Sequence, residues 1–281
     1  MRNEGGSAVT SDDPAASCEA VVKVYDSPAG EVTALKGVDA VVTPRAVTAL
    51  VGPSGAGKST LLRILAGFDT PTAGSVRIGG VETKGLRPSA LRSLRRSTIG
   101  YIFQRPADNL AAYQSVRDHL RQAAFVRGRS RGWADRADRL LDALKLSERA
   151  DHNPTQLSGG EQQRAAFAIA LMGEPMLVVA DEPTGELDSG SASQLLASVS
   201  ALARQGTAFV IGTHDPAVVG LADRAYHLRH GSVEAEARDD RRLSVIDEGG
   251  RIQLPPGWRQ LFPDGRAQII RGDDELRITP P

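Results

Sequence analysis

The sequence predicts an α/β domain built on a largely parallel sheet. Three segments, AVTALV at 46–51, MLVVA at 176–180 and AFVIG at 208–212, are apolar throughout, as strands covered on both faces of a sheet are. Segments with helical spacing of apolar residues separate these three strands, and a glycine-rich loop follows the strand AVTALV. Buried strands that alternate with helices are typical of a parallel sheet covered by helices.

The other elements follow from the same patterns along the chain. Apolar or alternating runs bounded by turn residues predict further strands at 21–25, 32–42, 75–78, 98–103 and 224–228. Helical spacing predicts helices at 58–66, 88–95, 191–204 and 216–222. From residue 105 to 157 the strand signals stop, and QSVRDHLRQAAFVRG and WADRADRLLDALKL read as helices. We therefore expect a helical insertion in the sheet domain.

The 281 residues include 34 Lys and Arg and 34 Asp and Glu, so the formal net charge is zero. This balance argues against a nucleic-acid-binding protein that relies on global attraction. Cys18 is the single cysteine, so neither an internal disulfide nor a cysteine metal cluster can form. No apolar run approaches the roughly 20 residues that span a bilayer, and the polar residues 1–17 do not resemble a signal peptide. We expect a cytoplasmic chain with a disordered segment at 1–17.

The loop GPSGAGKST at residues 52–60 fits the phosphate-binding pattern G-x-x-x-x-G-K-[ST] between a strand and a helix. Glycines let backbone N–H groups surround phosphates, and the helix N-terminus adds its positive dipole. In this pattern Lys58 reaches the β- and γ-phosphates, and Ser59 ligates Mg²⁺. A turn without a ligand would not require both side chains. The predicted nucleotide-binding residues here are Gly52, Pro53, Ser54, Gly55, Ala56, Gly57, Lys58, Ser59 and Thr60.

Polar residues follow the ends of three predicted strands. Asp181 and Glu182 follow the strand MLVVA, where Asp181 would hold Mg²⁺ and Glu182 would polarise the attacking water. Gln104 and His214 follow two other strands. Each of these residues alone would be an ordinary residue of a solvated turn. Because the carboxyl ends of parallel strands share one sheet edge, we expect these side chains to meet Lys58 there as a catalytic set.

The stretch LSGGE at residues 157–161 opens another helix and is a second candidate phosphate site. Its S-x-x-E spacing fits a capping box, in which Ser158 and Glu161 satisfy the first backbone groups of the helix. A capped helix N-terminus also binds anions, so the two interpretations are compatible. The candidate residues are Ser158, Gly159, Gly160 and Glu161.

Together these motifs resemble the nucleotide-binding subunit of ATP-binding-cassette (ABC) transporters. The resemblance covers about residues 18–236 and includes the phosphate loop (Walker A), the LSGGE signature and the later strand-end residues in the family's order. It implies a P-loop ABC ATPase core with an antiparallel β subdomain and a helical subdomain at about 105–172. It also implies a dimer in which the signature of one subunit covers the ATP held by the other. That arrangement would explain two phosphate sites in one chain.

Several roles follow from this resemblance alone. Tyr25 lies where the family stacks an aromatic ring on adenine, and Asp188 belongs to the D-loop that starts at Glu186. Gln104 matches the Q-loop glutamine, close to Mg²⁺, and His214 matches the switch histidine. The implied activity is ATP hydrolysis with Mg²⁺ by two such subunits, most simply identical ones. The segments ADEPTGELDS and FDTPTAGSVRIGG are similar to the corresponding segments of the macrolide-export, lipoprotein-release and cell-division ATPases.

That branch implies a separate integral membrane permease as partner, a location at the cytoplasmic face of the membrane, and no direct nucleic-acid partner. Two departures concern the partner rather than the ATP chemistry. Ile169 stands where relatives commonly have arginine, and RPADNLAAYQSVRDHL differs from the usual permease-facing segment after the Q-loop.

Two alternatives remain. A soluble ABC ATPase of translation or DNA repair usually carries two cassettes or a long coiled-coil insertion, and this chain shows neither. A binding module without activity is opposed by the intact Lys58, Asp181, Glu182 and His214.

Residues 237–281 are predicted to form a linker, ARDDRR, and a small β extension. Turn signals at 249–250, 255–257, 264–265 and 272–273 alternate with strand-like runs. The segment VIDEGGRIQLPP resembles the swapped hairpins of the AbrB type, which often pair two chains. About forty residues bury too little core to fold alone. We therefore expect this extension to pair with a second copy or to dock on the ATPase domain.

Overall fold

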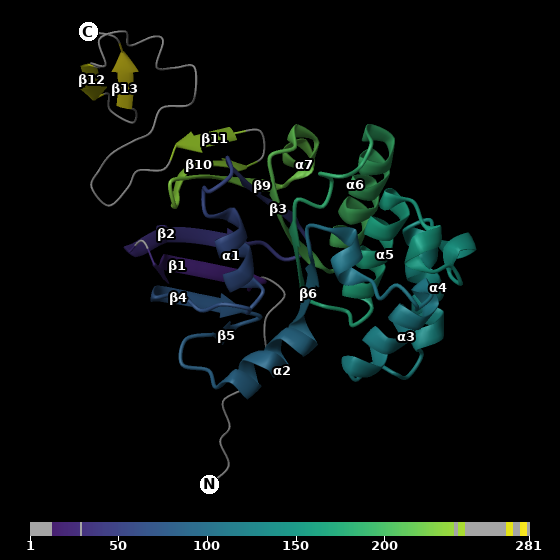
Figure 1. Cartoon of the computed structure of the whole chain (residues 1–281). Helices are drawn as coiled ribbons and strands as arrows, with labels where there is room; N and C mark the ends of the chain where they lie inside the picture. Colours follow the sequence, from purple (N-terminus) through teal and green to yellow (C-terminus); the bar gives the residue numbers. More distant parts are fainter. Residues whose placement is uncertain (1–12, 29, 239–240, 245–267, 272–275, 280–281) are drawn as a thin grey trace.

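The computed structural model describes residues 13–28, 30–238, 241–244, 268–271 and 276–279 (Figure 1). Helices and strands alternate along most of this length, which confirms the predicted α/β class. The strands are β1 Ala16–Ser27, β2 Gly30–Val42, β3 Val47–Val51, β4 Ala73–Ile78, β5 Val81–Glu82, β6 Ile99–Ile102, β7 Leu177–Asp181, β8 Ala208–Thr213, β9 Arg224–Arg229, β10 Ser232–Arg238, β11 Arg241–Ser244, β12 Gln268–Arg271 and β13 Leu276–Thr279. The α-helices are α1 Lys58–Leu65, α2 Pro88–Thr98, α3 Val116–Val126, α4 Trp133–Ala143, α5 Gly159–Leu171, α6 Ser189–Arg204 and α7 Pro216–Leu221. Short 3-10 turns lie at Pro106–Asn109, Ser147–Arg149 and Pro154–Gln156.

Two sheets make up the frame of the domain. The larger sheet has the order β11-β10-β9-β3-β8-β7-β6, and its strands from β9 to β6 are parallel. The smaller sheet, β2-β1-β4-β5, is antiparallel. Helix α1 contacts both sheets, and α5, α6 and α7 contact strands of the larger one (Figure 1).

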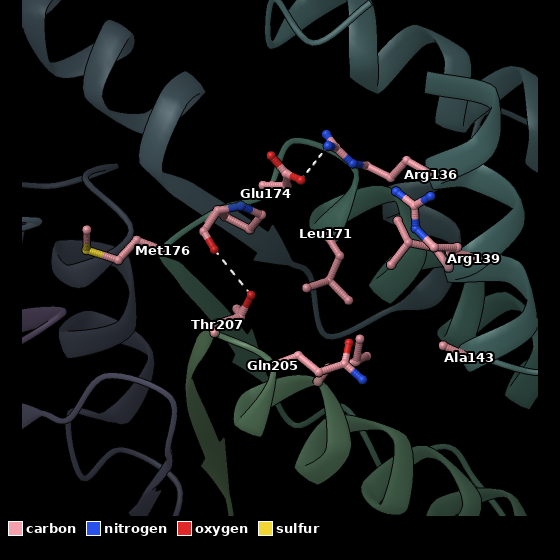
Figure 2. A pocket seen from close by; sticks show the side chains of 12 residues that line it. Arg136, Arg139, Ala143, Leu171, Glu174, Met176, Gln205 and Thr207 are labelled. Atoms are coloured by element: carbon pink, nitrogen blue, oxygen red, sulfur yellow. Dashed lines mark hydrogen bonds and ion pairs between the residues drawn. The ribbon is translucent and has the colours of Figure 1, made fainter. Parts of the chain in front are cut away.

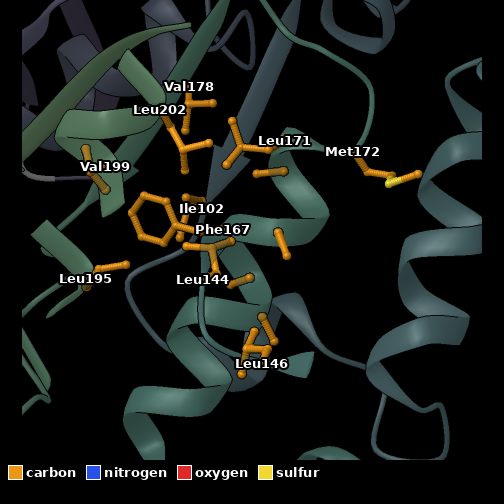
Figure 3. Packing of buried hydrophobic residues seen from close by; sticks show 14 of the residues in the cluster. Ile102, Leu144, Leu146, Phe167, Leu171, Met172, Val178, Leu195, Val199 and Leu202 are labelled. Carbon is orange, nitrogen blue, oxygen red and sulfur yellow. The ribbon is translucent and has the colours of Figure 1, made fainter. Parts of the chain in front are cut away.

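The central strands are apolar throughout because each face enters a different hydrophobic core. In β7, Leu177 and Val179 belong to the core around α1, whereas Val178 and Ala180 belong to the core shared with the later helices. Figure 3 shows this second core, where Phe167 of α5 lies among aliphatic side chains of the sheet and of neighbouring helices. Burial on both faces removes the period-two alternation of a half-exposed strand.

The prediction of disorder through residue 17 is wrong at its end. Strand β1 begins at Ala16, and the backbone N–H of Ala15 donates to the carbonyl of Val42 at 2.9 Å. Ala15 and Ala16 are buried. Small residues carry little hydrophobic signal by themselves, but here both belong to the hydrophobic core around α1.

The predicted linker after residue 236 is also wrong in its first part. Strand β10 continues to Arg238 and pairs with β11, with Arg238 opposite Arg241 and Glu236 opposite Leu243. This hairpin extends the larger sheet beyond β9. Edge strands pair through backbone hydrogen bonds and can carry charged side chains. The charged stretch ARDDRR therefore gave no strand pattern in the sequence. Farther along, β12 and β13 pair on either side of the predicted turn at 272–273. The other predicted turns of the tail lie outside the described residues.

Candidate functional site

The phosphate loop is held in shape by two neighbouring segments. It joins β3 to α1, and Gly57 at the helix start has φ +104°. A Cβ on Gly57 would lie 2.7 Å from the carbonyl oxygen of Ala34 in β2. The backbone N–H of Gly231, in the β9–β10 turn, donates to the carbonyl of Ala56 at 3.1 Å. The loop therefore needs glycine both for its conformation and for the close approach of β2.

Replacing Gly57 with alanine should destabilise the protein more than the same change at Gly55. Both glycines have positive φ, which costs an alanine roughly 1–2 kcal/mol. A Cβ at Gly55 would meet nothing within 4 Å, whereas at Gly57 it would meet backbone, a clash that costs about 1–3 kcal/mol more. Urea unfolding of the two variants without nucleotide measures the difference. Equal losses of stability would show that β2 does not constrain the loop.

Lys58 lies along the phosphate loop with its ammonium already surrounded by oxygens. Its Nζ donates to the carbonyls of Gly52 at 2.6 Å and Pro53 at 3.2 Å, and lies 3.8 Å from Oε1 of Glu182. Only 8% of the residue is exposed. The side chain is thus oriented toward the hollow of the loop, and a phosphate there would meet a cation whose position is largely fixed.

Asp181 and Ser59 form an oxygen-rich pair beside Lys58. Asp181 ends β7 and is 8% exposed. Burial raises its pKa, and a hydrogen bond from Ser59 and the charge of Lys58 only partly counteract this effect. A buried carboxylate of this kind gains from a divalent cation, and Mg²⁺ prefers oxygen ligands. The Asp181 carboxylate and the Ser59 hydroxyl therefore fit Mg²⁺, with the Gln104 amide as a third oxygen donor on the wall of the same cavity.

Glu182 and His214 face each other across the ends of β7 and β8. Glu182 has φ +45°, and its backbone N–H donates to the carbonyl of Gly212 at 2.8 Å. Its Oε1 lies 3.0 Å from Nδ1 of His214. The Thr184 hydroxyl donates to the Asp215 carboxylate at 2.8 Å and joins the two strand-end loops a second time. The strained backbone of Glu182 is thus fixed in a geometry that directs its carboxylate toward Lys58 and His214.

One cavity of about 590 Å³ unites these groups. The predicted residues that line it are Tyr25, Pro53, Ser54, Gly55, Ala56, Gly57, Lys58, Ser59, Thr60, Gln104, Asp181, Glu182 and His214. Gly52 contributes through its carbonyl contact with Lys58. The wall also includes Glu186, the first residue of the predicted D-loop, and four residues that the motifs did not predict, namely Val32, Thr33, Ala34 and Gly185. Val32, Thr33 and Ala34 lie on β2, whose position beside the loop is set by sheet pairing and leaves no local signal.

The signature residues and Asp188 do not line this cavity. Ser158 caps α5 in a complete capping box with Glu161, whose carboxylate also accepts a hydrogen bond from Arg149 Nε at 2.8 Å. The backbone N–H of Ser158 and then Arg149 stabilise the charged form, so the pKa of Glu161 is lowered.

The signature instead lies next to the part of the D-loop that contains Asp188. Asp188 caps α6 by accepting from the backbone N–H of Ser191 at 2.9 Å. A Cβ on Gly160 would lie 3.0 Å from Ser191 Oγ. The N-termini of α5 and α6 therefore form a second surface, separate from the phosphate-loop cavity.

This arrangement matches a known family. The family described as "ABC transporter" matches residues 35–185, more than half of the chain. The chain belongs to the ABC transporter family. It is an ATP-binding, ATP-hydrolysing cassette, and the resemblance inferred from its motifs is confirmed, including the macrolide-export branch.

Curated relatives of this ABC ATPase include the macrolide export ATP-binding/permease protein MacB of Rhodospirillum rubrum. The two are 40% identical over 236 residues, which cover 84% of this chain and 36% of that protein. MacB 1 of Aeromonas hydrophila is 42% identical over 78% of this chain and 35% of its own length. The chain thus spans about a third of the length of these relatives.

Solved structures share the fold closely. A dimeric bacterial ABC transporter cassette superposes with a TM-score of 0.73 at 33% identity, covering 80% of this chain and 99% of that chain. A dimeric cassette in a post-hydrolysis state with ADP and phosphate bound gives a TM-score of 0.72 at 33% identity, with the same coverage. These likenesses confirm the P-loop ABC fold.

Two other cavities lie away from the ATP site of this ABC ATPase. One, of about 520 Å³, lies between α4, the turn before β7 and the end of α6, with Arg136 paired to Glu174 on its wall (Figure 2). No predicted site residue lines it. The other, of about 330 Å³, lies between the end of β6, α3 and α5.

Among the described residues, no helix has the length and apolar character needed to cross a membrane.

Proposed function

We propose that this ABC ATPase works as a dimer that closes on two Mg-ATP and drives a membrane permease. The observation that carries the dimer is the separation of the two phosphate sites. The signature surface at Ser158 cannot serve the cavity around Lys58 in the same chain, because it does not line that cavity. A second subunit placed head to tail would bring its signature over this ATP. The dimeric cassettes among the relatives support that arrangement.

In the proposed reaction, a water oxygen attacks the γ-phosphorus and the bond to the β–γ bridging oxygen breaks, which releases ADP and phosphate. Glu182 accepts the water proton, and His214 holds Oε1 of Glu182 in place. Lys58 balances the charge that develops on the phosphate oxygens. Bound at Asp181, Ser59 and Gln104, Mg²⁺ would neutralise further phosphate charge.

The proposed site for the permease is the cavity of about 330 Å³ between the end of β6, α3 and α5, which we call the helical groove. Tyr101, Phe103, Val126, Arg127 and Ile169 are among its lining residues. Phe103 and Val126 are exposed at 44% and 59%, and such apolar exposure is typical of a contact surface. Ile169 adds apolar surface to this groove, at the position where the resemblance led us to expect arginine. We propose that an apolar segment of the permease docks here.

The decisive experiment is capture of the tagged protein with Mg-ATP from detergent-solubilised membranes of the organism that encodes it, followed by mass spectrometry. We expect a polytopic membrane protein at near-equal stoichiometry. Val126→Glu places a charge in the helical groove and should abolish its recovery. Val81→Glu is the matched control on an exposed strand of the smaller sheet, where the valine is 41% exposed, and should retain the partner.

Other outcomes would redirect the proposal. Recovery of ribosomes or soluble proteins alone would favour the soluble ABC ATPase and remove the membrane role. Equal recovery with both variants would place the contact outside the helical groove. We propose that the permease exports or extracts a substrate; the MacB relatives are named for macrolide export. The identity of the captured permease would narrow the class of cargo.

A further inference from the structure

The hydroxyl of Tyr25 is held from two sides, although the ring lies at the wall of the ATP cavity. It donates a hydrogen bond to Oδ2 of Asp69 at 2.8 Å. Thr60, in the first turn of α1, also acts on this hydroxyl, where it partly opposes the burial that raises the pKa of Tyr25. Asp69 follows the other end of α1, where its backbone N–H donates to the carbonyl of Arg63 at 3.2 Å. Strand β1 is therefore tied through Tyr25 and Asp69 to the C-terminal end of the phosphate-loop helix.

Lys23 completes the arrangement on the same strand. Its Nζ donates to Oδ1 of Asp69 at 2.6 Å and to the carbonyl of Thr70 at 2.9 Å. It also lies 4.8 Å from the centroid of the Tyr25 ring. Both charged side chains are largely buried, with 12% of Lys23 and 18% of Asp69 exposed. Burial alone would raise the pKa of Asp69, but hydrogen bonds from Lys23 and Tyr25 outweigh it and the pKa is lowered.

This geometry fixes both the position and the electronic environment of one aromatic ring. A tyrosine at a cavity wall ordinarily turns about its side-chain bonds, and a ligand that stacks on it must immobilise it. Here the hydroxyl is tethered, so that motion is already restricted. A cation occupies one face of the ring, which leaves the other face for a flat, electron-rich group. Neither Asp69 nor Lys23 lines the cavity, so both would act through Tyr25.

We propose that Asp69 and Lys23 are positioning residues for the nucleobase: they lock the Tyr25 ring in the orientation that stacks on the purine of ATP. The proposal rests on the proposed ATP site, whose wall includes Tyr25, and on the adenine-stacking role that the family resemblance implies for this residue. It assigns no contact between Asp69 or Lys23 and the nucleotide. Their removal should therefore weaken recognition of the base and leave the phosphate chemistry intact.

The test compares Asp69→Asn, Tyr25→Phe and Tyr25→Ala in the full-length protein. Asp69→Asn keeps the shape but removes the charge that holds Lys23, and Tyr25→Phe keeps the ring but removes its tether. Each should raise the KM for ATP roughly three- to tenfold with kcat unchanged. The affinity for inorganic tripolyphosphate, which has no base, should not change. Asp26→Asn is the matched control, because Asp26 is an exposed carboxylate adjacent to Tyr25 whose side chain makes no hydrogen bond or ion pair with the described residues.

A double variant separates positioning from a structural role. In a Tyr25→Ala background, Asp69→Asn should have no further effect on KM, since the ring it positions is gone. Additive effects of the two substitutions on KM would overturn the proposal. A loss of tripolyphosphate affinity in Asp69→Asn as large as the rise in its KM for ATP would also overturn it, because Asp69 would then act through α1. If Tyr25→Ala left the KM for ATP unchanged, the stacking role and this proposal would both fall, although ATP hydrolysis itself would stand. A wild-type protein without ATPase activity would instead overturn the proposed function.

Discussion

Replacing Glu182 with glutamine should slow ATP hydrolysis by about 100- to 10,000-fold, the usual contribution of a general base. Glutamine keeps the shape of the side chain and can still accept the hydrogen bond from the backbone N–H of His214. It cannot take the proton of the attacking water. The nucleotide contacts of Lys58 and the phosphate loop remain, so ATP binding should persist. Phosphate release and equilibrium ATP binding, measured on the same preparation, separate the two effects.

The same variant tests the dimer. With hydrolysis blocked, Mg-ATP should hold two subunits together, and sedimentation should shift from monomer to dimer only when ATP is present. Glu186→Gln is the matched control, because Glu186 lies on the same cavity wall without contacting Lys58 or His214. It should retain most of the activity. Normal turnover in Glu182→Gln would show that another group activates the water, and a monomer with ATP bound would contradict the head-to-tail arrangement.

Replacing Lys58 with alanine should lower the affinity for Mg-ATP by about 30- to 5,000-fold. The phosphates would lose a charge that the structure holds in place, and removal of one partner from a desolvated ionic contact costs about 2–5 kcal/mol. The affinity is measured by calorimetry. Lys84→Ala is the control, since Lys84 is exposed and lies outside the ATP cavity.

The Lys58 variant needs one further measurement. Lys58 also donates to the carbonyls of Gly52 and Pro53, so its loss could deform the loop. Thermal unfolding without nucleotide should show a small change in stability compared with the loss of binding. If ATP affinity were unchanged in a folded Lys58→Ala protein, the assignment of the phosphate loop would be wrong.

The sequence alone determined the parts of the protein that a few consecutive residues can build. The phosphate loop needs glycines at set positions, and the structure shows Gly57 at φ +104°. The spacing of Ser158 and Glu161 predicted a capping box, and both of its hydrogen bonds are present. These features depend on short-range sterics and backbone hydrogen bonds, which act within one turn of chain. The same holds for the apolar strands, whose burial on both faces is visible in composition alone.

The tertiary structure decided the individual contacts between residues distant in sequence. Glu182 meets His214, 32 residues later, and Tyr25 meets Asp69, 44 residues later. The strand-end pattern predicted that Glu182 and His214 share a sheet edge, but it did not specify which of their atoms pair. No local pattern predicted that Tyr25 would meet Asp69, because packing sets which loops become neighbours. The extra strand β11 belongs here too, since an edge pairs through its backbone whatever its side chains are. The signature likewise lies outside the ATP cavity of its own chain, where α5 packs against α6. The local sequence around Ser158 does not specify this separation.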